Sequence, residues 1–423
     1  GCAKGSNEEA YLFQKLIRTG FKTNNVDHCT RLCHASSVSA LLETIGSAAV
    51  TAPVINCLDS DLIIVAGANP TVNHPVAASF MKNAVKSGAE MIVMDPRLNG
   101  LKNYSSHFLQ FAPGTDVAML NGIINVIIEE KLYNKQYVDT FAEGFSEYSQ
   151  HILKYPPEKM EPICKITATE IRAVARKIAS ANSAMIFWGM GIAQHTHGTD
   201  NARCLIALAL LCGHIGKKGA GLHPLRGQNN VQGASDAGLI PMMYPDYKLV
   251  EDFEAREFFE EFWQVDLDKK AGLTVVEIMD AVYKNEIRFM YIMGENPAMS
   301  DPDTAHARKA LSKLNHLVVQ DIFLTETAAF ADVIFPASAW PEKDGSVTNT
   351  DRRVQLGSKV INSPGDARPD WLIIRDLANL LGLNWAYDSP QDIHNEMTKC
   401  MPSMENIPWK RLEKEGSVTY PSV

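Results

Sequence analysis

Residues 61–96 decide the fold, and they read DLIIVAGANPTVNHPVAASFMKNAVKSGAEMIVMDP. They open with an apolar run that stops at Gly67-Ala-Asn-Pro70, which predicts a short buried strand followed by a tight turn. A helical stretch from about residue 74 to 86 leads to a second apolar run, residues 90–94, which ends at Asp95. The segment therefore predicts a strand–helix–strand unit with parallel strands and a right-handed crossover.

The same order of elements returns later in the chain. The apolar run of residues 288–293 stops at Gly294-Glu-Asn-Pro297, a helix is expected over about 304–314, and residues 317–320 end at Asp321. The turn glycine and the closing aspartate are 28 residues apart in the first copy and 27 in the second. A chance recurrence of Asn-Pro turns is the alternative, and the matched spacing and order count against it.

The two units predict where ligands bind. Parallel sheets of this kind bind ligands beyond the carboxyl ends of their strands, where both Gly-x-Asn-Pro turns lie. An acidic residue at the end of the second strand commonly hydrogen-bonds the ribose or base of a nucleotide. We therefore expect two nucleotide-bearing ligands, or one ligand with two such halves.

Other segments extend the α/β pattern. Further strands are expected at 184–187 and 333–335, and the apolar run 205–211 predicts a buried helix. Pro113-Gly-Thr-Asp116 precedes an amphipathic helix, which Thr115 or Asp116 could cap. The amides at that helix start suit a phosphate, although most such starts are only caps.

Composition excludes several classes of protein. The 423 residues are 46% apolar and 21% charged, which is typical of a globular enzyme with more than one domain. The net charge of -9 argues against nucleic acid, because a duplex-binding face needs clustered Lys and Arg. No apolar run approaches the roughly 20 residues that cross a bilayer, so no membrane association is expected.

The eight cysteines are scattered, and none forms a CxxC pair. This scatter does not match a secreted disulfide framework, so a reducing cytoplasm is the expected location. It also argues against an iron–sulfur cluster held by this chain alone. A plain NAD dehydrogenase is disfavoured because no GxGxxG follows a predicted strand.

The most unusual cluster is His28-Cys29-x3-Cys33-His34. Its four side chains could hold zinc, although the spacing does not match the usual structural sites. Alternatively, one thiolate binds a soft metal beside a histidine. A third interpretation is two buried cysteines next to two surface histidines.

The second unusual segment is residues 221–233, GLHPLRGQNNVQG. It is rich in glycine and amides, has no apolar periodicity, and carries Arg226 as its single cation. We expect a loop that hydrogen-bonds a polar ligand, in which the guanidinium suits a small carboxylate. The alternative is a hydrogen-bonded turn with a surface arginine.

Several phrases together resemble one enzyme family. CTRLCH at 29–34, GANP at 67–70, WGMG at 188–191 and RGQNNVQG at 226–233 are similar to the catalytic subunits of bis-pterin molybdenum or tungsten formate dehydrogenases. The resemblance runs in order over essentially the whole chain. The sequences of residues 24–28 and 201–211 are most similar to those of cytosolic, NAD-linked members.

This resemblance implies a reaction and its residues. Cys33 occupies the position of the metal-ligating cysteine or selenocysteine, His34 that of the adjacent active-site histidine, and Arg226 that of the arginine that positions formate. The implied cofactor is bis-molybdopterin guanine dinucleotide with molybdenum or tungsten, one nucleotide for each strand–helix–strand unit. Formate would give carbon dioxide and two electrons, reversibly in principle, and the electrons would pass to iron–sulfur clusters outside this chain.

The resemblance also implies three groups of cofactor-binding residues, each of which could instead be a turn or cap without ligand contact. One dinucleotide would contact Asn69, Asp95, Arg97, Gly114 and Asp116. The other would contact Gly294, Glu295, Gln320, Asp321 and Thr325. The pterin region would be lined by Met190, Gly191, Gln194, Gly227 and Gln228.

The implied fold is α/β, with two Rossmann-like parallel-sheet domains that are related by pseudosymmetry and discontinuous in sequence. Residues 29–228 would form the domain with the metal-ligand cysteine and the substrate arginine, and residues 1–28 with 229–423 the second. The family's N-terminal domain with its [4Fe-4S] cluster would precede Gly1, and a C-terminal domain would follow Val423. Residues 342–370 would pack toward that cluster domain, and the expected partners are iron–sulfur and flavin/NAD-linked electron-transfer subunits.

Two alternatives share this fold. Another bis-pterin oxidoreductase, such as a nitrate reductase, is disfavoured by the Cys33-His34 pair together with Arg226. A structural protein resembling the large peripheral subunit of respiratory complex I would have no reason to retain these three residues together. Formate-dependent dye reduction and nitrate-dependent dye oxidation would distinguish a formate dehydrogenase from a nitrate reductase. Metal and pterin analysis would distinguish an enzyme from a structural protein.

Overall fold

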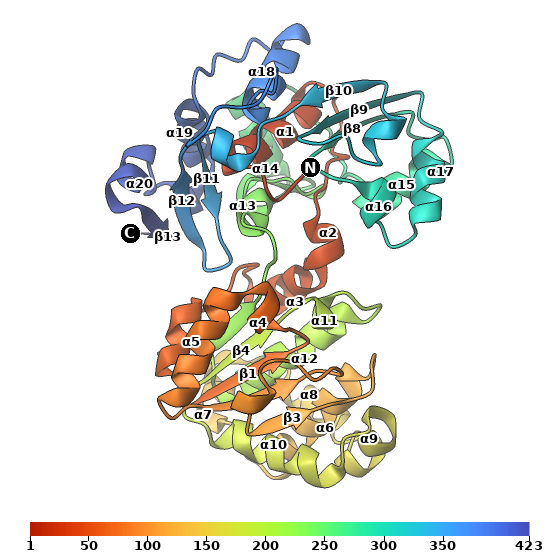
Figure 1. The fold of residues 1–423 in the computed structure, drawn as a ribbon. Coiled ribbons are helices and arrows are strands. Elements are labelled where there is room, and N and C mark those ends of the chain that lie inside the picture. The colour runs from red at the N-terminus through yellow and green to blue at the C-terminus, as the bar shows by residue number, and fades with distance from the viewer. Residues whose placement is uncertain (423) are drawn as a thin grey trace. The chain divides into compact units, whose positions relative to one another are not determined.

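The computed structural model describes residues 1–422, which form two compact units. Residues 32–227 make the five-stranded unit, and residues 1–31 with 228–423 make the split unit. Both contain parallel sheets joined by helices, so the expected α/β class is confirmed (Figure 1). The expected domain organisation, with boundaries after residues 28 and 228, stays a prediction.

The sheet of the five-stranded unit is parallel throughout, with the strand order β3-β2-β1-β4-β5. Its strands are β1 (Leu62–Ala66), β2 (Glu90–Met94), β3 (His107–Leu109), β4 (Ala184–Trp188) and β5 (Gly221–Pro224). Between β1 and β2 lie α4 (Pro70–Asn73) and α5 (Pro75–Lys86), so the first predicted strand–helix–strand unit is confirmed. The strand expected at 184–187 is confirmed as β4.

Side chains of β1 alternate between two cores because successive residues of a strand point to opposite faces. Leu62, Ile64 and Ala66 pack with α6 (Asp116–Glu129), α10 (Ala168–Ser180) and α12 (Gly198–Cys212). Ile63 and Val65 pack with α5 and the 3-10 helix η1 (Val54–Asp59). Helices therefore cover both faces of this sheet, as buried parallel strands require (Figure 1).

The remaining helices of this part of the chain are mostly short. The expected buried helix at 205–211 is confirmed within α12. The others are α2 (Thr30–Cys33), α3 (Ala35–Ile45), η2 (Lys102–Tyr104), α7 (Lys135–Phe141), α8 (Phe145–Ile152), α9 (Pro157–Cys164) and α11 (Met190–Ala193).

The split unit contains the second predicted copy. Its parallel sheet has the order β10-β9-β8, with β8 at Phe289–Met293, β9 at His316–Asp321 and β10 at Val333–Pro336. The helices α16 (Pro297–Ser300) and α17 (Thr304–Leu311) connect β8 to β9, so this unit is confirmed too. An antiparallel sheet adds β11 (Gly345–Thr348), β12 (Arg353–Gly357) and β13 (Ser417–Thr419), and a hairpin adds β6 (Met243–Tyr244) and β7 (Lys248–Leu249).

A fully buried helix, α1 (Asn7–Thr19), lies at the centre of the split unit. It begins with a capping box in which Ser6 and Glu9 satisfy each other's backbone N–H groups. The other helices of this unit are α13 (Val231–Asp236), η3 (Pro245–Tyr247), α14 (Phe253–Trp263), α15 (Val275–Tyr283), η4 (Ala328–Phe330), η5 (Trp340–Glu342), α18 (Asp370–Leu380), α19 (Pro390–Cys400), η6 (Pro402–Met404) and α20 (Trp409–Glu415).

Two local expectations were wrong. The segment 221–233 is not one loop, because it starts with β5 and ends with α13. Gly221-Leu-His-Pro224 has little intrinsic strand preference, and its pairing with β4 overrides this. At α6, Thr115 takes the N-cap position without a side-chain cap bond, since its hydroxyl donates to the Ala112 carbonyl at 2.6 Å.

No helix within residues 1–422 is both long enough and apolar enough to cross a membrane.

Candidate active site

The site lies where the strand order of the five-stranded sheet reverses, at the carboxyl ends of β1 and β4. The chain leaves β1 through Gly67, which has a φ of +54° and accepts the Gly191 N–H at 3.0 Å. A Cβ atom on Gly67 would stand 2.7 Å from the Gly191 carbonyl carbon. Glycine therefore permits both the turn and the close approach of the two strand ends.

Replacing Gly67 by alanine should destabilise the five-stranded unit by about 3 kcal/mol, because backbone strain and a backbone clash add. Gly144→Ala is the matched control, since Gly144 has a φ of +68° with nothing within 4 Å of its added Cβ. It should cost only about 1 kcal/mol. Urea unfolding of both variants measures the difference, and equal losses would show that the close approach at Gly67 carries no cost.

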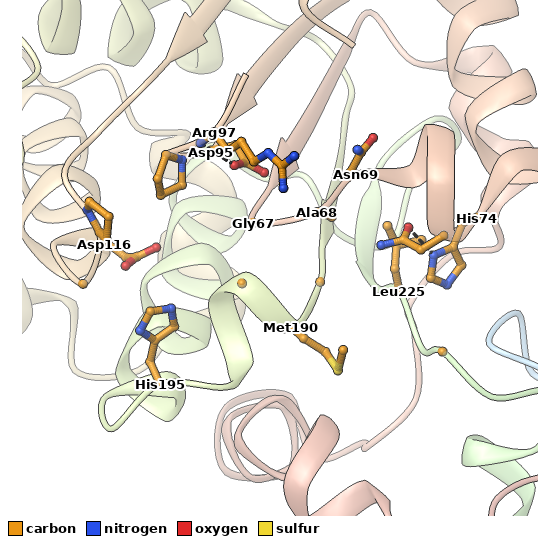
Figure 2. A pocket seen from close by; sticks show the side chains of 17 residues that line it. Gly67, Ala68, Asn69, His74, Asp95, Arg97, Asp116, Met190, His195 and Leu225 are labelled. Carbon is orange, nitrogen blue, oxygen red and sulfur yellow. Dashed lines mark hydrogen bonds between the residues drawn. The ribbon is translucent and has the colours of Figure 1, made fainter. Parts of the chain in front are cut away.

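A pocket of about 550 Å³ opens at this edge of the sheet (Figure 2). All five residues expected to contact the first dinucleotide line it: Asn69, Asp95, Arg97, Gly114 and Asp116. Three residues expected near the pterin also line it: Met190, Gly191 and Gly227. The structure thus brings together residues that are far apart in sequence, and their role in binding stays a prediction.

Asp116 is the most informative polar residue of the pocket. It is the first residue of α6, is 2% exposed, and its Oδ1 has no hydrogen-bond partner in the described part of the chain. Burial raises the pKa of its carboxyl group, and its own backbone N–H opposes that rise. A buried acceptor without a donor is costly, so Asp116 is suited to accept N–H groups from a ligand.

Asp95 and Asn69 hold the turns after β2 and β1. The Arg97 N–H donates to the Asp95 carboxylate at 2.8 Å, and burial raises the pKa of this carboxyl group. The Asn69 amide oxygen accepts the Thr71 hydroxyl at 2.6 Å. Both side chains therefore stabilise the pocket wall, and Figure 2 shows them with Arg97 along one side of it.

Two histidines of the pocket were missed by the sequence interpretation. His74 lies at the start of α5 and faces the Arg226 carbonyl oxygen through Nε2 at 2.7 Å. His195 lies near Asp116, whereas the neighbouring Gln194 donates to the Leu32 carbonyl and does not line the pocket (Figure 2). His74 lies between α4 and α5 and directly precedes Pro75, a helix-start signal that could have identified it.

Cys33 lies beside the pocket, at the end of α2. Its sulfur is 3.4 Å from the Met190 sulfur and accepts the Gly227 N–H, and both of these residues line the pocket. Burial raises the pKa of the Cys33 thiol, while the Gly227 N–H and the Arg226 charge act in the opposite direction. The thiol and the guanidinium are therefore close enough to interact electrostatically.

Arg226 is buried, with 3% of its surface exposed. Its Nη2 donates to the Ala48 carbonyl at 2.6 Å. Its Nε and Nη1 are buried and have no hydrogen-bond partner among residues 1–422. A buried cation with unused N–H groups is suited to bind a small anion.

His34 is fully buried next to Cys33. Its Nε2 lies 3.0 Å from the Leu225 carbonyl oxygen, and its Nδ1 lies 3.1 Å from the Ser37 hydroxyl. Burial, followed by the Arg226 charge, lowers the pKa of His34 to about 3. The imidazole is therefore neutral near pH 7.

The second expected nucleotide set lies in the split unit, where β8 and β9 end. Gly294 and Glu295 follow β8, and burial raises the pKa of Glu295 to about 7. Gln320 is fully buried; the Tyr291 hydroxyl donates to its oxygen, and its nitrogen donates to Asp370 at 2.7 Å. These bonds give Gln320 a structural role within the sheet.

Two further predicted residues complete this set, and Gln228 belongs to the predicted pterin region. Asp321 accepts the Ile322 N–H at 2.7 Å, and Thr325 accepts the Ala328 N–H at 3.2 Å, so both hold the turn after β9. The Gln228 amide oxygen is buried without a hydrogen-bond partner in the described residues. Nucleotide binding by Asp321 and Thr325, and pterin contact by Gln228, stay predictions.

Zinc bound by His28, Cys29, Cys33 and His34 finds no support. Among residues 1–422, no three or more His, Cys, Asp or Glu side chains are grouped as ligands for a metal ion. A soft metal held by Cys33 together with non-protein ligands remains consistent with the geometry.

Comparison with known proteins identifies the family. The family model of molybdopterin oxidoreductases matches residues 2–380. The chain belongs to the molybdopterin oxidoreductase family.

The F420-dependent formate dehydrogenase subunit alpha of Methanocaldococcus jannaschii is 46% identical over 98% of this molybdopterin oxidoreductase and 61% of its own length. Formate dehydrogenase H of Escherichia coli is 38% identical over 100% of the chain and 59% of its own length. The expected resemblance to formate dehydrogenases is thus confirmed, while that to NAD-linked members stays a prediction. The chain spans about three fifths of these relatives.

A solved structure, acetylene hydratase from Pelobacter acetylenicus, shares the fold. It superimposes with a TM-score of 0.80 at 22% identity, over 99% of this chain and 59% of its own. At this identity the likeness bears on the fold alone.

Membership of the molybdopterin oxidoreductase family implies a molybdopterin cofactor with molybdenum or tungsten. The residues present fit such a group. The pocket at the strand ends offers an unpaired buried acceptor at Asp116, and the soft sulfur of Cys33 lies at its margin beside Met190. Cys33 would hold the metal of such a group, and this role stays a prediction.

Proposed function

We propose that this chain is the central part of a molybdenum- or tungsten-dependent formate dehydrogenase subunit, which converts formate to carbon dioxide and two electrons. The observation that carries the proposal is the convergence of a metal-binding thiol, Cys33, with a buried guanidinium, Arg226, that has unused N–H groups. Formate is a small carboxylate, and a guanidinium binds a carboxylate through charge-assisted hydrogen bonds.

The residues of the chain have separable roles. Arg226 neutralises formate and orients it, and its burial strengthens this interaction by excluding water. Cys33 holds the metal, and the bound cofactor supplies the two-electron acceptor. The resemblance places His34 in the active site beside Cys33, and its two nitrogens are already engaged by Leu225 and Ser37.

We further propose that the cofactor is the bis-guanine-dinucleotide form. Guanine presents N–H donors, and the unpaired Asp116 carboxylate oxygen suits them. Asn69, Asp95, Arg97 and Gly114 would complete this site, and the turn residues after β8 and β9 would hold the second nucleotide.

The partners of this protein are proposed by the same reasoning. Two relatives are named alpha subunits, so this chain works within a larger assembly with iron–sulfur and electron-transfer subunits. A [4Fe-4S] cluster in a preceding domain and a flavin/NAD-linked acceptor are the finer expectations. The cysteines are scattered along the chain without a CxxC pair, and this scatter supports a reducing cytoplasm as the proposed location.

The test uses the full-length subunit purified from its host. We expect it to contain molybdenum or tungsten, to release guanine nucleotide on acid hydrolysis, and to reduce a viologen dye with formate. Oxidation of reduced viologen by nitrate without formate activity would instead identify a nitrate reductase. Absence of both metal and pterin would identify a structural relative, and either result overturns the proposal.

A further inference from the structure

Four hydrogen bonds close a ring, here called the His34 circuit, in the five-stranded unit. The Leu225 N–H donates to the Trp188 carbonyl at 2.8 Å, and the Leu225 carbonyl lies 3.0 Å from His34 Nε2. His34 Nδ1 lies 3.1 Å from the Ser37 hydroxyl oxygen, and Trp188 Nε1 donates to that same oxygen at 2.8 Å. The circuit links the ends of β4 and β5 to α3, and its members are at most 3% exposed.

Chemistry fixes the direction of two bonds in the circuit. A carbonyl oxygen can only accept, so His34 must carry a proton on Nε2. An indole N–H can only donate, so the Ser37 oxygen accepts from Trp188. The Ser37 hydroxyl proton is then available to His34 Nδ1, and no group of the circuit needs water.

The circuit fixes the backbone directly before Arg226. Leu225 is held at both its N–H and its carbonyl, and it directly precedes Arg226. Two further hydrogen bonds hold Arg226 itself. Its carbonyl oxygen is bonded to His74 Nε2, and its guanidinium Nη2 donates to the Ala48 carbonyl. The position of the buried Arg226 head therefore depends on the orientation of the His34 ring.

We propose that Ser37 and Trp188 are positioning residues that lock the His34 ring with its Nε2 proton on the Leu225 carbonyl, and so hold Arg226 in place for its substrate. The kinetic part of this proposal rests on the proposed formate chemistry. His34 then acts through the Leu225–Arg226 peptide, and its contribution requires a hydrogen-bond donor on Nε2.

The first test removes single bonds of the circuit in the full-length subunit. Ser37→Ala should raise KM for formate about tenfold, the scale of one lost buried hydrogen bond, with a smaller change in kcat. Trp188→Phe retains the ring but removes the N–H and should act in the same direction. In the double variant, the rise in KM should be smaller than the product of the two single rises, because both residues act through the His34 ring. Ser39→Ala, on the same helix outside the circuit, is the control and should change neither constant.

A second variant separates positioning from proton transfer. In His34→Gln, the side-chain amide can still donate a hydrogen bond to the Leu225 carbonyl, but it cannot take up and release a proton as an imidazole can. We expect His34→Ala to lose activity and His34→Gln to lose much less of it. Equal losses in the two variants, or an unchanged KM in Ser37→Ala, would overturn the proposal.

The third readout does not depend on turnover. Nitrogen-15 NMR of histidine-labelled protein reports which ring nitrogen carries the proton, and His34 is assigned by the signal that His34→Gln loses. We expect the Nε2–H form in the wild-type protein and a mixture of forms in Ser37→Ala. A wild-type Nδ1–H form would overturn the circuit. If the wild-type subunit fails to oxidise formate, the proposed function falls while this measurement still decides the role of Ser37.

Discussion

Replacing Arg226 by alanine is expected to lower kcat/KM for formate about a thousandfold, the scale for removing one partner of a buried, charge-assisted contact. Arg226 is 3% exposed, and two of its guanidinium nitrogens have no partner in the described structure. In the variant, formate would lose both its counter-charge and the N–H groups that orient it. KM should rise and kcat should fall, because binding and orientation depend on the same group.

Two further variants make the Arg226 prediction specific. Arg226→Lys retains the charge but not the planar array of donors, so its kcat/KM should lie between those of the wild type and Arg226→Ala. Arg203→Ala is the control, because Arg203 is a surface residue paired with Glu43 and Asp200. Steady-state formate kinetics on the full-length subunit measure all three variants. A kcat/KM of Arg226→Ala within about tenfold of the wild type would show that this guanidinium does not hold the substrate.

The parts of the fold that could be predicted are those encoded in short segments. Both strand–helix–strand units follow from apolar runs that end in Gly-x-Asn-Pro turns, because buried parallel strands are continuous apolar segments. The strand β5 was missed for the opposite reason. Its sequence begins with glycine and ends with proline, and it is extended because it pairs with Met185 to Trp188 of β4. Such pairing is a tertiary effect that local preference does not contain.

The same distinction applies to the candidate site. The family resemblance implied Asn69, Asp95 and Asp116 as cofactor contacts, and all three lie next to the ends of elements at the ligand-binding edge of the sheet. His74 was missed because its partner, the Arg226 carbonyl, is 152 residues away in the sequence. The low pKa of His34 was also beyond prediction, since it arises from burial and from the charge of Arg226.

The largest effect on stability is expected at Lys343 in the split unit. Its ammonium group lies 2.9 Å from a Glu9 carboxylate oxygen and also contacts Asp370, and all three residues are at most 8% exposed. Burial alone would lower the pKa of Lys343, and the two carboxylates reverse this and raise it. Lys343→Met should therefore cost about 4 kcal/mol in the free energy of unfolding, because two buried carboxylates lose their cation.

The pH dependence of that loss follows from the carboxylates. Burial raises the pKa of Glu9 even with Lys343 present, and removing the lysine should raise it further. A carboxyl group with a raised folded pKa contributes stability below its unfolded pKa of about 4 and loses it as pH rises through the folded value. The difference between Lys343→Met and the wild type should accordingly be full at pH 7 and shrink toward pH 4.

Companion substitutions separate charge from packing at this position. Glu9→Gln alone should cost about 1 kcal/mol, because Lys343 retains Asp370 and the new amide oxygen can still accept the Ser6 N–H. Combining Lys343→Met with Glu9→Gln and Asp370→Asn should recover more than half of the loss, since neutral groups of similar shape need no buried counter-charge. Urea unfolding at pH 7 and pH 4.5 provides the free energies. A triple variant as unstable as Lys343→Met would assign the loss to packing and contradict the electrostatic explanation.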